Sequence, residues 1–157
     1  MHNQNLKPVI VPPEDGRTIT VLGADITVKL SSSDTKGDFY IFEGAVASGG
    51  GVPPHVHSRE DEILEVLAGE FELVLGPNHF KLAEGGMAFF PRNVAHGFTN
   101  SGTTPAKYRI TVSPGSNFEE FFEELSALPL DQSPDSDKVS EIFERFGLPI
   151  VNSQASE

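Results

Sequence analysis

Cysteine is absent from the 157-residue sequence, so the chain has neither disulfide bonds nor thiolate metal ligands. No apolar run approaches the length needed to cross a bilayer, and residues 1–8 lack the apolar core of a signal peptide. The lack of cysteine is compatible with a reducing compartment. From these absences we expect a cytoplasmic protein.

Basic residues are also scarce. The chain has 11 Lys and Arg against 23 Asp and Glu, which gives a formal net charge of -12. A negative field of this size repels phosphate backbones and anionic membrane surfaces, so we expect neither nucleic acid nor membrane as a partner. Hydrophobic residues make up an ordinary 38% of the chain, and its length fits a single domain over residues 1–157.

Short apolar runs and alternations fill the chain from about residue 9 to residue 112, and Gly, Pro, Asn and Asp separate them. The first of these runs covers residues 9–11 and ends at two prolines. Many short strands at this spacing are typical of an antiparallel sandwich or barrel. The sequence therefore predicts an all-β domain over this region.

A helical extension is predicted at about residues 117–147. Asn117 can cap a first helix, which Pro129 ends, and a second helix runs up to Gly147. Each helix has one apolar face, made by Phe118, Phe121, Phe122 and Leu125 in the first and by Val139, Ile142, Phe143 and Phe146 in the second. We expect both helices to pack on the outside of the barrel or across a dimer interface. Docking of another protein is the alternative, which ordinary base rates disfavour.

Four side chains are candidate metal ligands. His55, His57 and Glu62 lie within eight residues, and His96 follows downstream. Alternate side chains of an extended segment project to one side, so His55 and His57 can bind one ion. Glu62 would complete the two-histidine, one-carboxylate set that is typical of non-haem iron, and His96 would close the site from another strand.

Two neighbouring carboxylates, Glu60 and Asp61, compete with Glu62 for this role. We expect them in a solvated loop, because only Glu62 has the right spacing and begins the next strand. Asn93 occupies a turn that requires a positive φ, which Asn tolerates well. Asn100 is expected to bond to nearby backbone.

Candidate pocket residues follow from the alternation of the strands. Phe98 lies on the same face as His96, and Tyr108, Phe71 and Leu73 occupy inward positions of their own strands. Core packing explains the same pattern equally well. A cavity lined in this way would favour an aromatic or otherwise apolar substrate over a sugar phosphate.

Two segments resemble the signature motifs of the cupin superfamily, and the helical tail that ends at residues 146–149 resembles that of the small single-domain cupins often labelled quercetin-dioxygenase-like. The first motif is formed by Gly49, His55, His57, Glu62 and Gly69, and the second by Gly85, Pro91, Asn93, His96 and Asn100. Asn93 stands where the family pattern has Gly. The resemblance implies a double-stranded β-helix, or jelly-roll barrel, and a metal held by His55, His57, Glu62 and His96. Iron, manganese, nickel, copper, cobalt and zinc all occur at this site in the family, and the donor types do not choose among them.

The expected function is a metal-dependent dioxygenase that acts on a small aromatic or apolar molecule, with Glu62 also serving as a base. A metal-dependent isomerase, lyase or hydrolase is one alternative, and a non-catalytic small-ligand or metal-binding protein is another. No separate organic cofactor is expected. The resemblance and the apolar helices also lead us to expect a homodimer.

Overall fold

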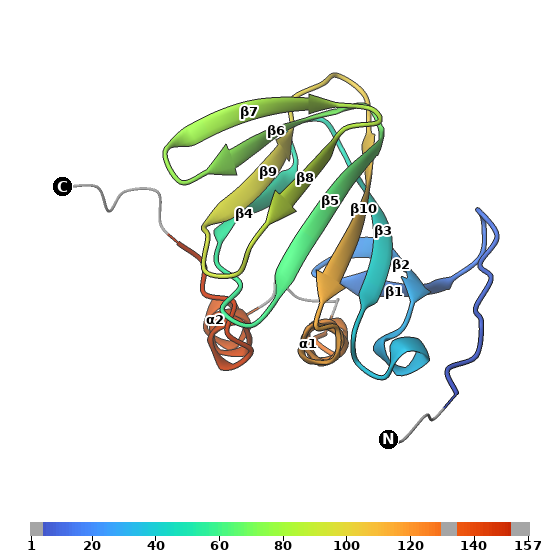
Figure 1. The fold of residues 1–157 in the computed structure, drawn as a ribbon. Helices are drawn as coiled ribbons and strands as arrows, with labels where there is room; N and C mark the ends of the chain where they lie inside the picture. The colour runs from blue at the N-terminus through green and yellow to red at the C-terminus, as the bar shows by residue number, and fades with distance from the viewer. Residues whose placement is uncertain (1–4, 130–134, 152–157) are drawn as a thin grey trace.

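Two antiparallel β-sheets face each other and form most of the molecule (Figure 1). The computed structural model describes residues 5–129 and 135–151. The strands are β1 (Arg17–Val21), β2 (Ala24–Leu30), β3 (Tyr40–Val46), β4 (Gly51–His55), β5 (Asp61–Ala68), β6 (Glu70–Leu75), β7 (Asn78–Ala83), β8 (Met87–Phe90), β9 (His96–Asn100) and β10 (Ala106–Ser113). The helices are the short 3₁₀ helix η1 (Ser32–Thr35), α1 (Ser116–Ser126) and α2 (Ser136–Arg145).

The connectivity is that of a jelly roll. One sheet has the strand order β1-β2-β3-β10-β5-β8 and the other has the order β4-β9-β6-β7, so strands that are distant in sequence become neighbours. The predicted fold class, an all-β double-stranded β-helix followed by two α-helices, is confirmed. The crossing between the sheets matters for function because it brings β5 opposite β4 and β9.

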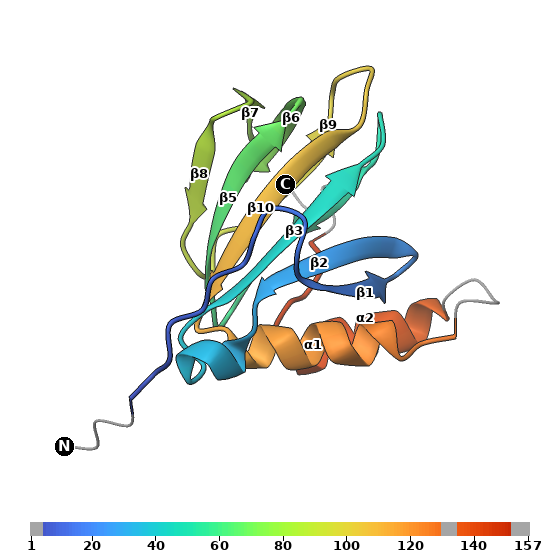
Figure 2. The ribbon, with the colours of Figure 1, turned by 90° about the vertical axis from the view of Figure 1, so that its right-hand side faces the viewer.

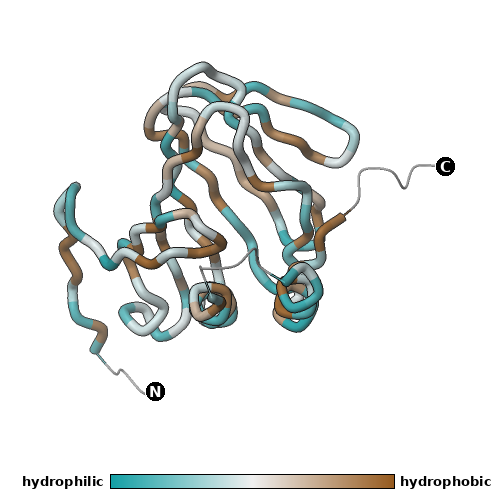
Figure 3. Tube along the Cα trace, turned by 180° about the vertical axis from the view of Figure 1, so that it is seen from behind, coloured by the Kyte–Doolittle hydropathy of each residue, from teal (hydrophilic) through white to brown (hydrophobic). Residues whose placement is uncertain are grey.

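The strands bury alternate residues in the space between the sheets. On β10, Tyr108, Ile110 and Val112 are buried, whereas Lys107 is exposed and Arg109 is half-buried. Figure 3 shows the same alternation of polar and apolar residues along several strands. The inward set predicted from the sequence is therefore correct for β10, as the two-residue period of a strand requires.

The predicted strand at residues 9–11 is not formed. The first strand begins at Arg17, and the preceding arm runs along the outer side of the larger sheet (Figure 2), where 90% of the surface of Ile10 is exposed. Prolines at positions 8, 12 and 13 have no N–H group to offer a sheet, so the arm cannot pair along its length. Instead, Lys29 binds it by donating to the backbone oxygens of Pro12 and Pro13.

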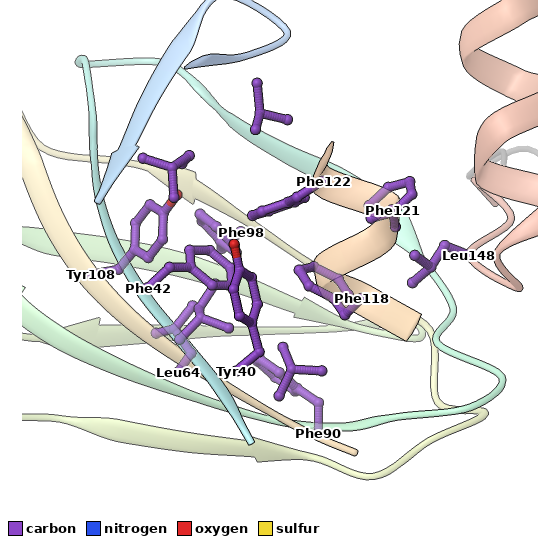
Figure 4. Close-up of a cluster of buried hydrophobic side chains, with 14 of the residues drawn as sticks. Tyr40, Phe42, Leu64, Phe90, Phe98, Tyr108, Phe118, Phe121, Phe122 and Leu148 are labelled. Carbon is purple, nitrogen blue, oxygen red and sulfur yellow. The ribbon is translucent and has the colours of Figure 1, made fainter. Parts of the chain in front are cut away.

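Both α-helices lie across one end of the two sheets, where β10 ends and β5 begins (Figures 1 and 2). Phe118 and Phe122 of α1 pack on Phe42 of β3, with ring centroids 5.8 and 4.9 Å away (Figure 4). The helices therefore pack on the barrel as expected, but across its end and not along the outer face of a sheet. The sheets leave apolar side chains uncovered at this end, and the helices bury them. No helix in the described part of the chain is long and apolar enough to span a membrane.

The first helix begins two residues earlier than predicted. It starts at Ser116, with Gly115 at the capping position, so Asn117 lies inside the first turn and does not cap it. Its side chain is free to bond elsewhere, and it does so beside the candidate metal ligands. The homodimer stays a prediction. Most of the apolar helix residues that favoured it are buried within the chain itself.

Candidate metal centre

Three histidines and one glutamate converge at the helix-covered end of the sandwich. His55 ends β4, His57 follows two residues later, His96 begins β9 and Glu62 is the second residue of β5. His55 and His96 are direct partners across the β4–β9 ladder, and Glu62 faces them from the other sheet. One donor atom from each of the four side chains lies within 4.8 Å of all the others, and all four residues are buried.

Backbone carbonyls orient two of the histidines. The Nδ1 atom of His55 lies 2.9 Å from the oxygen of Pro53, and the Nδ1 atom of His96 lies 3.0 Å from the oxygen of Val94. A carbonyl can only accept a hydrogen bond, so each Nδ1 carries the proton. Each Nε2 therefore keeps a lone pair with which it can bind a metal. Metal-binding histidines are commonly held in this way.

The Nε2 atoms gather around the carboxylate. Glu62 Oε2 lies 3.0 Å from Nε2 of His57 and 3.6 Å from Nε2 of His96, and the Nε2 atoms of His55 and His57 are 3.0 Å apart. Nε2 of His96 is buried and has no hydrogen-bond partner. An ion with bonds of about 2.0–2.2 Å keeps its ligands within roughly 4 Å of one another, close to the spread observed here. The residues therefore fit one divalent transition metal.

The four groups differ in their affinity for protons. Burial lowers the pKa of His55 to about 4. Burial also opposes the charging of His57, but contacts with the carboxylates of Glu60 and Glu62 raise its pKa to about 9. Burial raises the pKa of Glu62, yet the contacts with His57 and His96 outweigh it and hold that pKa well below its usual range. Without a metal, His57 and Glu62 thus form a buried ion pair.

Glu60 is an unforeseen member of the site. It is only 1% exposed, and its Oε2 lies 3.7 Å from Nδ1 of His57. Its Oε1 accepts a hydrogen bond of 2.5 Å from Asn117, which also donates to the backbone oxygen of Phe146. The predicted solvated loop is therefore wrong for Glu60, whereas Asp61 is partly exposed and pairs with Arg92. No pattern in the sequence distinguishes these two neighbours, because Asn117 is 57 residues away.

The C-terminal segment supports the segment that carries two of the ligands. The backbone N–H groups of Val56 and Ser58 donate to the oxygens of Pro149 and Gly147 at 3.1 and 2.9 Å. Phe118 of α1 also stacks on the ring of His57, with centroids 5.4 Å apart and planes 12° apart. The helical extension is therefore part of the site, which the sequence pattern did not predict.

We expect Glu60→Gln to lower the affinity for a divalent metal about 10–100-fold, the usual effect of losing a partner of a ligating histidine. The amide cannot hold the Nδ1 proton of His57 as a carboxylate does. Competition with a chelating dye measures this affinity. Glu65→Gln is the matched control, since Glu65 lies on β5, five residues further along the chain, and its side chain is 41% exposed. Equal affinities in the two variants would contradict the role of Glu60.

Metal binding at pH 7 is expected to release about one proton per ion, because a metal ligand must be deprotonated. With a pKa of about 9, His57 is protonated at this pH in the metal-free protein, whereas His55, with a pKa of about 4, is not. The release should vanish as the pH rises through 9. Calorimetry in buffers with different ionisation enthalpies measures it, and Glu60→Gln should reduce it. Release that stays constant up to pH 10 would refute this assignment.

A cavity of about 330 Å³ lies beside the four side chains, and both His55 and Glu62 line it. Most of its wall is apolar and includes Phe98, Tyr108 and, from the helices, Phe121 and Phe143. No Lys or Arg occurs among the described residues that line it. Small-molecule sites are typically apolar cavities of this size with a few polar groups.

Two of the four predicted pocket residues, Phe98 and Tyr108, line the cavity. The other two, Phe71 and Leu73, do not. They are buried on β6, where the ring of Phe71 packs against Phe98 with centroids 5.4 Å apart. Core packing, the alternative explanation of their alternation, accounts for both. Residue parity alone cannot separate a cavity wall from the layer behind it.

Comparisons with known proteins agree with this fold and site. Residues 42–113, which contain all four candidate ligands, match the family model described as a cupin domain. An uncharacterized protein with a double-stranded β-helix domain from Klebsiella pneumoniae is 26% identical, with a TM-score of 0.52 over 68% of this chain and 84% of that one. The polyketide cyclase RemF from Streptomyces resistomycificus is 25% identical, with a TM-score of 0.58 over 69% and 80% of the two chains.

A further structure, KdgF from a Halomonas species, is 20% identical, with a TM-score of 0.62 over 71% of this chain and 99% of that chain. This likeness concerns the fold alone. Among curated proteins, none matches this sequence. Residues 42–113 thus resemble a cupin domain, and the chain combines two facing antiparallel sheets with a buried cluster of three histidines and a glutamate that is consistent with a metal site.

Proposed function

We propose that this protein is a metal-dependent cupin enzyme that acts on a small, uncharged and largely apolar organic molecule. The observation that carries the proposal is that His55 and Glu62 belong both to the metal-ligand cluster and to the wall of the apolar cavity. A molecule in this cavity would therefore lie next to the ion. An anionic substrate is disfavoured, because the described lining has no basic side chain and Glu62 is negatively charged.

His55, His57, Glu62 and His96 would hold the ion. Their nitrogen and oxygen donors suit iron, manganese, nickel, copper, cobalt and zinc. A bound ion would supply Lewis acidity and, if it is redox-active, a path for electrons. The helices α1 and α2 would exclude water from the cavity, since their apolar side chains form part of its wall.

The reaction class that we propose is dioxygenation of an aromatic substrate. Glu62 is the candidate base, because its carboxylate lines the cavity and can accept a proton from a substrate hydroxyl. The cavity supports such a substrate through its size, about twice the roughly 150 Å³ that accommodates benzene. One or two rings would fit.

The test is oxygen uptake. Protein loaded separately with each of the six metals is mixed with a panel of catechols and flavonols in an oxygen-electrode cell. We expect consumption of dioxygen with at least one redox-active metal and none with zinc, with metal-free protein or with His57→Ala. Metal content is measured in each sample so that an unloaded site is recognised. The absence of uptake with every redox-active metal would exclude the proposed dioxygenase.

A second candidate is a metal-dependent reaction that uses no oxygen, such as a cyclisation. The similarity to a polyketide cyclase at 25% identity favours it. Turnover of an aromatic substrate under argon, with the same metal dependence, would identify this class. Metal-dependent binding of aromatic probes without turnover in air or argon would instead indicate a non-catalytic binding protein.

A further inference from the structure

Besides the candidate metal ligands, the cavity wall contains one tyrosine, Tyr108, whose hydroxyl is polar. This side chain lies on β10, is 6% exposed and lines the cavity. Its ring packs against Phe98, Phe42 and Phe71, with centroids 5.4, 6.3 and 6.2 Å away. The ring is thus fixed by three aromatic neighbours, and the position of the hydroxyl is fixed with it.

No hydrogen bond to the Tyr108 hydroxyl occurs within residues 5–129 and 135–151, and the side chain that carries it lines the cavity. Space for the hydroxyl comes from Gly44, the cross-strand partner of Tyr108 on β3. A Cβ atom at residue 44 would collide with the hydroxyl oxygen. The hydroxyl is therefore accommodated without being bonded, which leaves it available to a ligand.

Tyr108 and Glu62 both line the cavity, and their backbone positions are separated along the strands. Val112 of β10 is the cross-strand partner of Glu62, and Tyr108 precedes it by four residues on the same face. Four residues of strand span about 13 Å. Ile110, between them, also lines the cavity. In Figure 4, Tyr108 lies on the side of the buried cluster away from Leu148 and Phe121.

The wall between Tyr108 and Glu62 consists almost wholly of carbon. Among its residues Tyr108 is the one side chain with a hydroxyl in the described lining, and Glu62 and His55 are the ionisable metal-site groups there. Burial, together with the negative charge of Glu62, raises the pKa of Tyr108 to about 12. The group is therefore an O–H donor at neutral pH.

We propose that Tyr108 determines specificity by donating a hydrogen bond to a second oxygen of the substrate, a carbonyl or hydroxyl at the far end of an aromatic framework whose first oxygen faces the metal ligands. This inference rests on the proposed function, because it assumes that the substrate occupies the cavity. It narrows the substrate class to neutral aromatic compounds with an oxygen at each end.

The test is direct binding to the zinc-loaded protein, in which no redox turnover occurs. Two pairs of phenols are used, and each pair differs by one carbonyl oxygen: 4-hydroxyacetophenone with 4-ethylphenol, and 6-hydroxy-1-tetralone with 5,6,7,8-tetrahydro-2-naphthol. Calorimetry gives the ratio of the two dissociation constants for each pair. The ratio is compared between protein variants, so that the different acidity of the two phenols cancels.

We expect Tyr108→Phe to reduce the preference for the ketone about three- to tenfold, the usual effect of one neutral hydrogen bond, and to leave binding of the deoxygenated phenol unchanged. Tyr40→Phe is the matched control. Tyr40 is the other tyrosine of the chain, and its hydroxyl is buried without a partner, but Tyr40 is not among the residues that line the cavity. Its loss should leave the ratio as in the original protein.

Two results would overturn the inference in distinguishable ways. If the probes bind only when zinc is present but the ratio is the same in Tyr108→Phe and the original protein, Tyr108 has no such role and the proposed function stands. If no probe binds in a zinc-dependent way to any variant, the cavity is not a site for neutral aromatic compounds. The proposed function then fails together with the inference.

Discussion

Replacement of His57 by alanine is expected to lower metal content and metal affinity at least tenfold. Loss of a partner that merely orients a ligand costs about 10–100-fold, and loss of the ligand itself should cost no less. His57 contacts every part of the site: its Nε2 lies 3.0 Å from both Glu62 and His55. Elemental analysis of protein purified from its native source, and then of the variant, measures the effect.

His79→Ala is the matched control for this prediction. His79 lies on β7, its side chain is 58% exposed, it pairs with Glu72 at 3.1 Å, and it does not belong to the cluster of candidate ligands. Its replacement should leave metal content unchanged. Equal metal content in His57→Ala and His79→Ala would contradict the assignment of the metal centre, because His57 would then matter no more for metal binding than a histidine outside the cluster.

Phe118→Ala is expected to lower the free energy of unfolding by about 3–5 kcal/mol, the usual loss for a buried phenylalanine. Phe118 is 5% exposed and packs between Phe42 of the sheet, Phe122 of its own helix and His57. The truncation leaves a cavity under α1 and removes the ring that supports a metal ligand. Urea unfolding of metal-free protein measures the loss without a contribution from metal binding.

A measurement of metal affinity separates the packing role of Phe118 from its contact with His57. Metal affinity should also fall in Phe118→Ala, while Phe80→Ala should change the unfolding free energy by no more than about 0.5 kcal/mol, as is usual for exposed positions. Phe80 lies on β7 and is 52% exposed. A Phe118 variant with reduced stability but unchanged metal affinity would show that α1 closes the sandwich without supporting His57.

The strands that carry the four candidate ligands were predictable because their pattern is local. His55 and His57 share one face of an extended segment, and Asn93 adopts the expected positive φ of 69° in the turn before His96. The N–H of Asn93 donates to the carbonyl of His57 at 2.7 Å, so this turn also joins the two motifs. Asn100 bonds to the backbone oxygens of Val46 and Thr104, as expected for the end of its strand.

The predictions that failed concern residues whose surroundings come from distant parts of the chain. The sequence around Glu60 predicts a solvated acid, but Glu60 accepts a hydrogen bond from Asn117 of α1. The sequence around Asn117 predicts a helix cap, but Gly115 occupies the capping position. The arm at residues 5–16 has the apolar content of a strand, but its prolines prevent pairing. In each case, the prediction from the local sequence pattern fails because it omits a tertiary contact or a backbone restriction.

The amino-acid sequence alone determined the kind of donor atoms, their spacing and the inward face of β10, because alternation along a strand depends only on neighbouring residues. The tertiary structure decided that the helices cover the site, that Glu60 contacts His57 and that Tyr108, but not Phe71, lines the cavity. These outcomes depend on how two sheets and two helices exclude water from a shared interior. Side chains separated by many residues meet there only when the whole chain has packed.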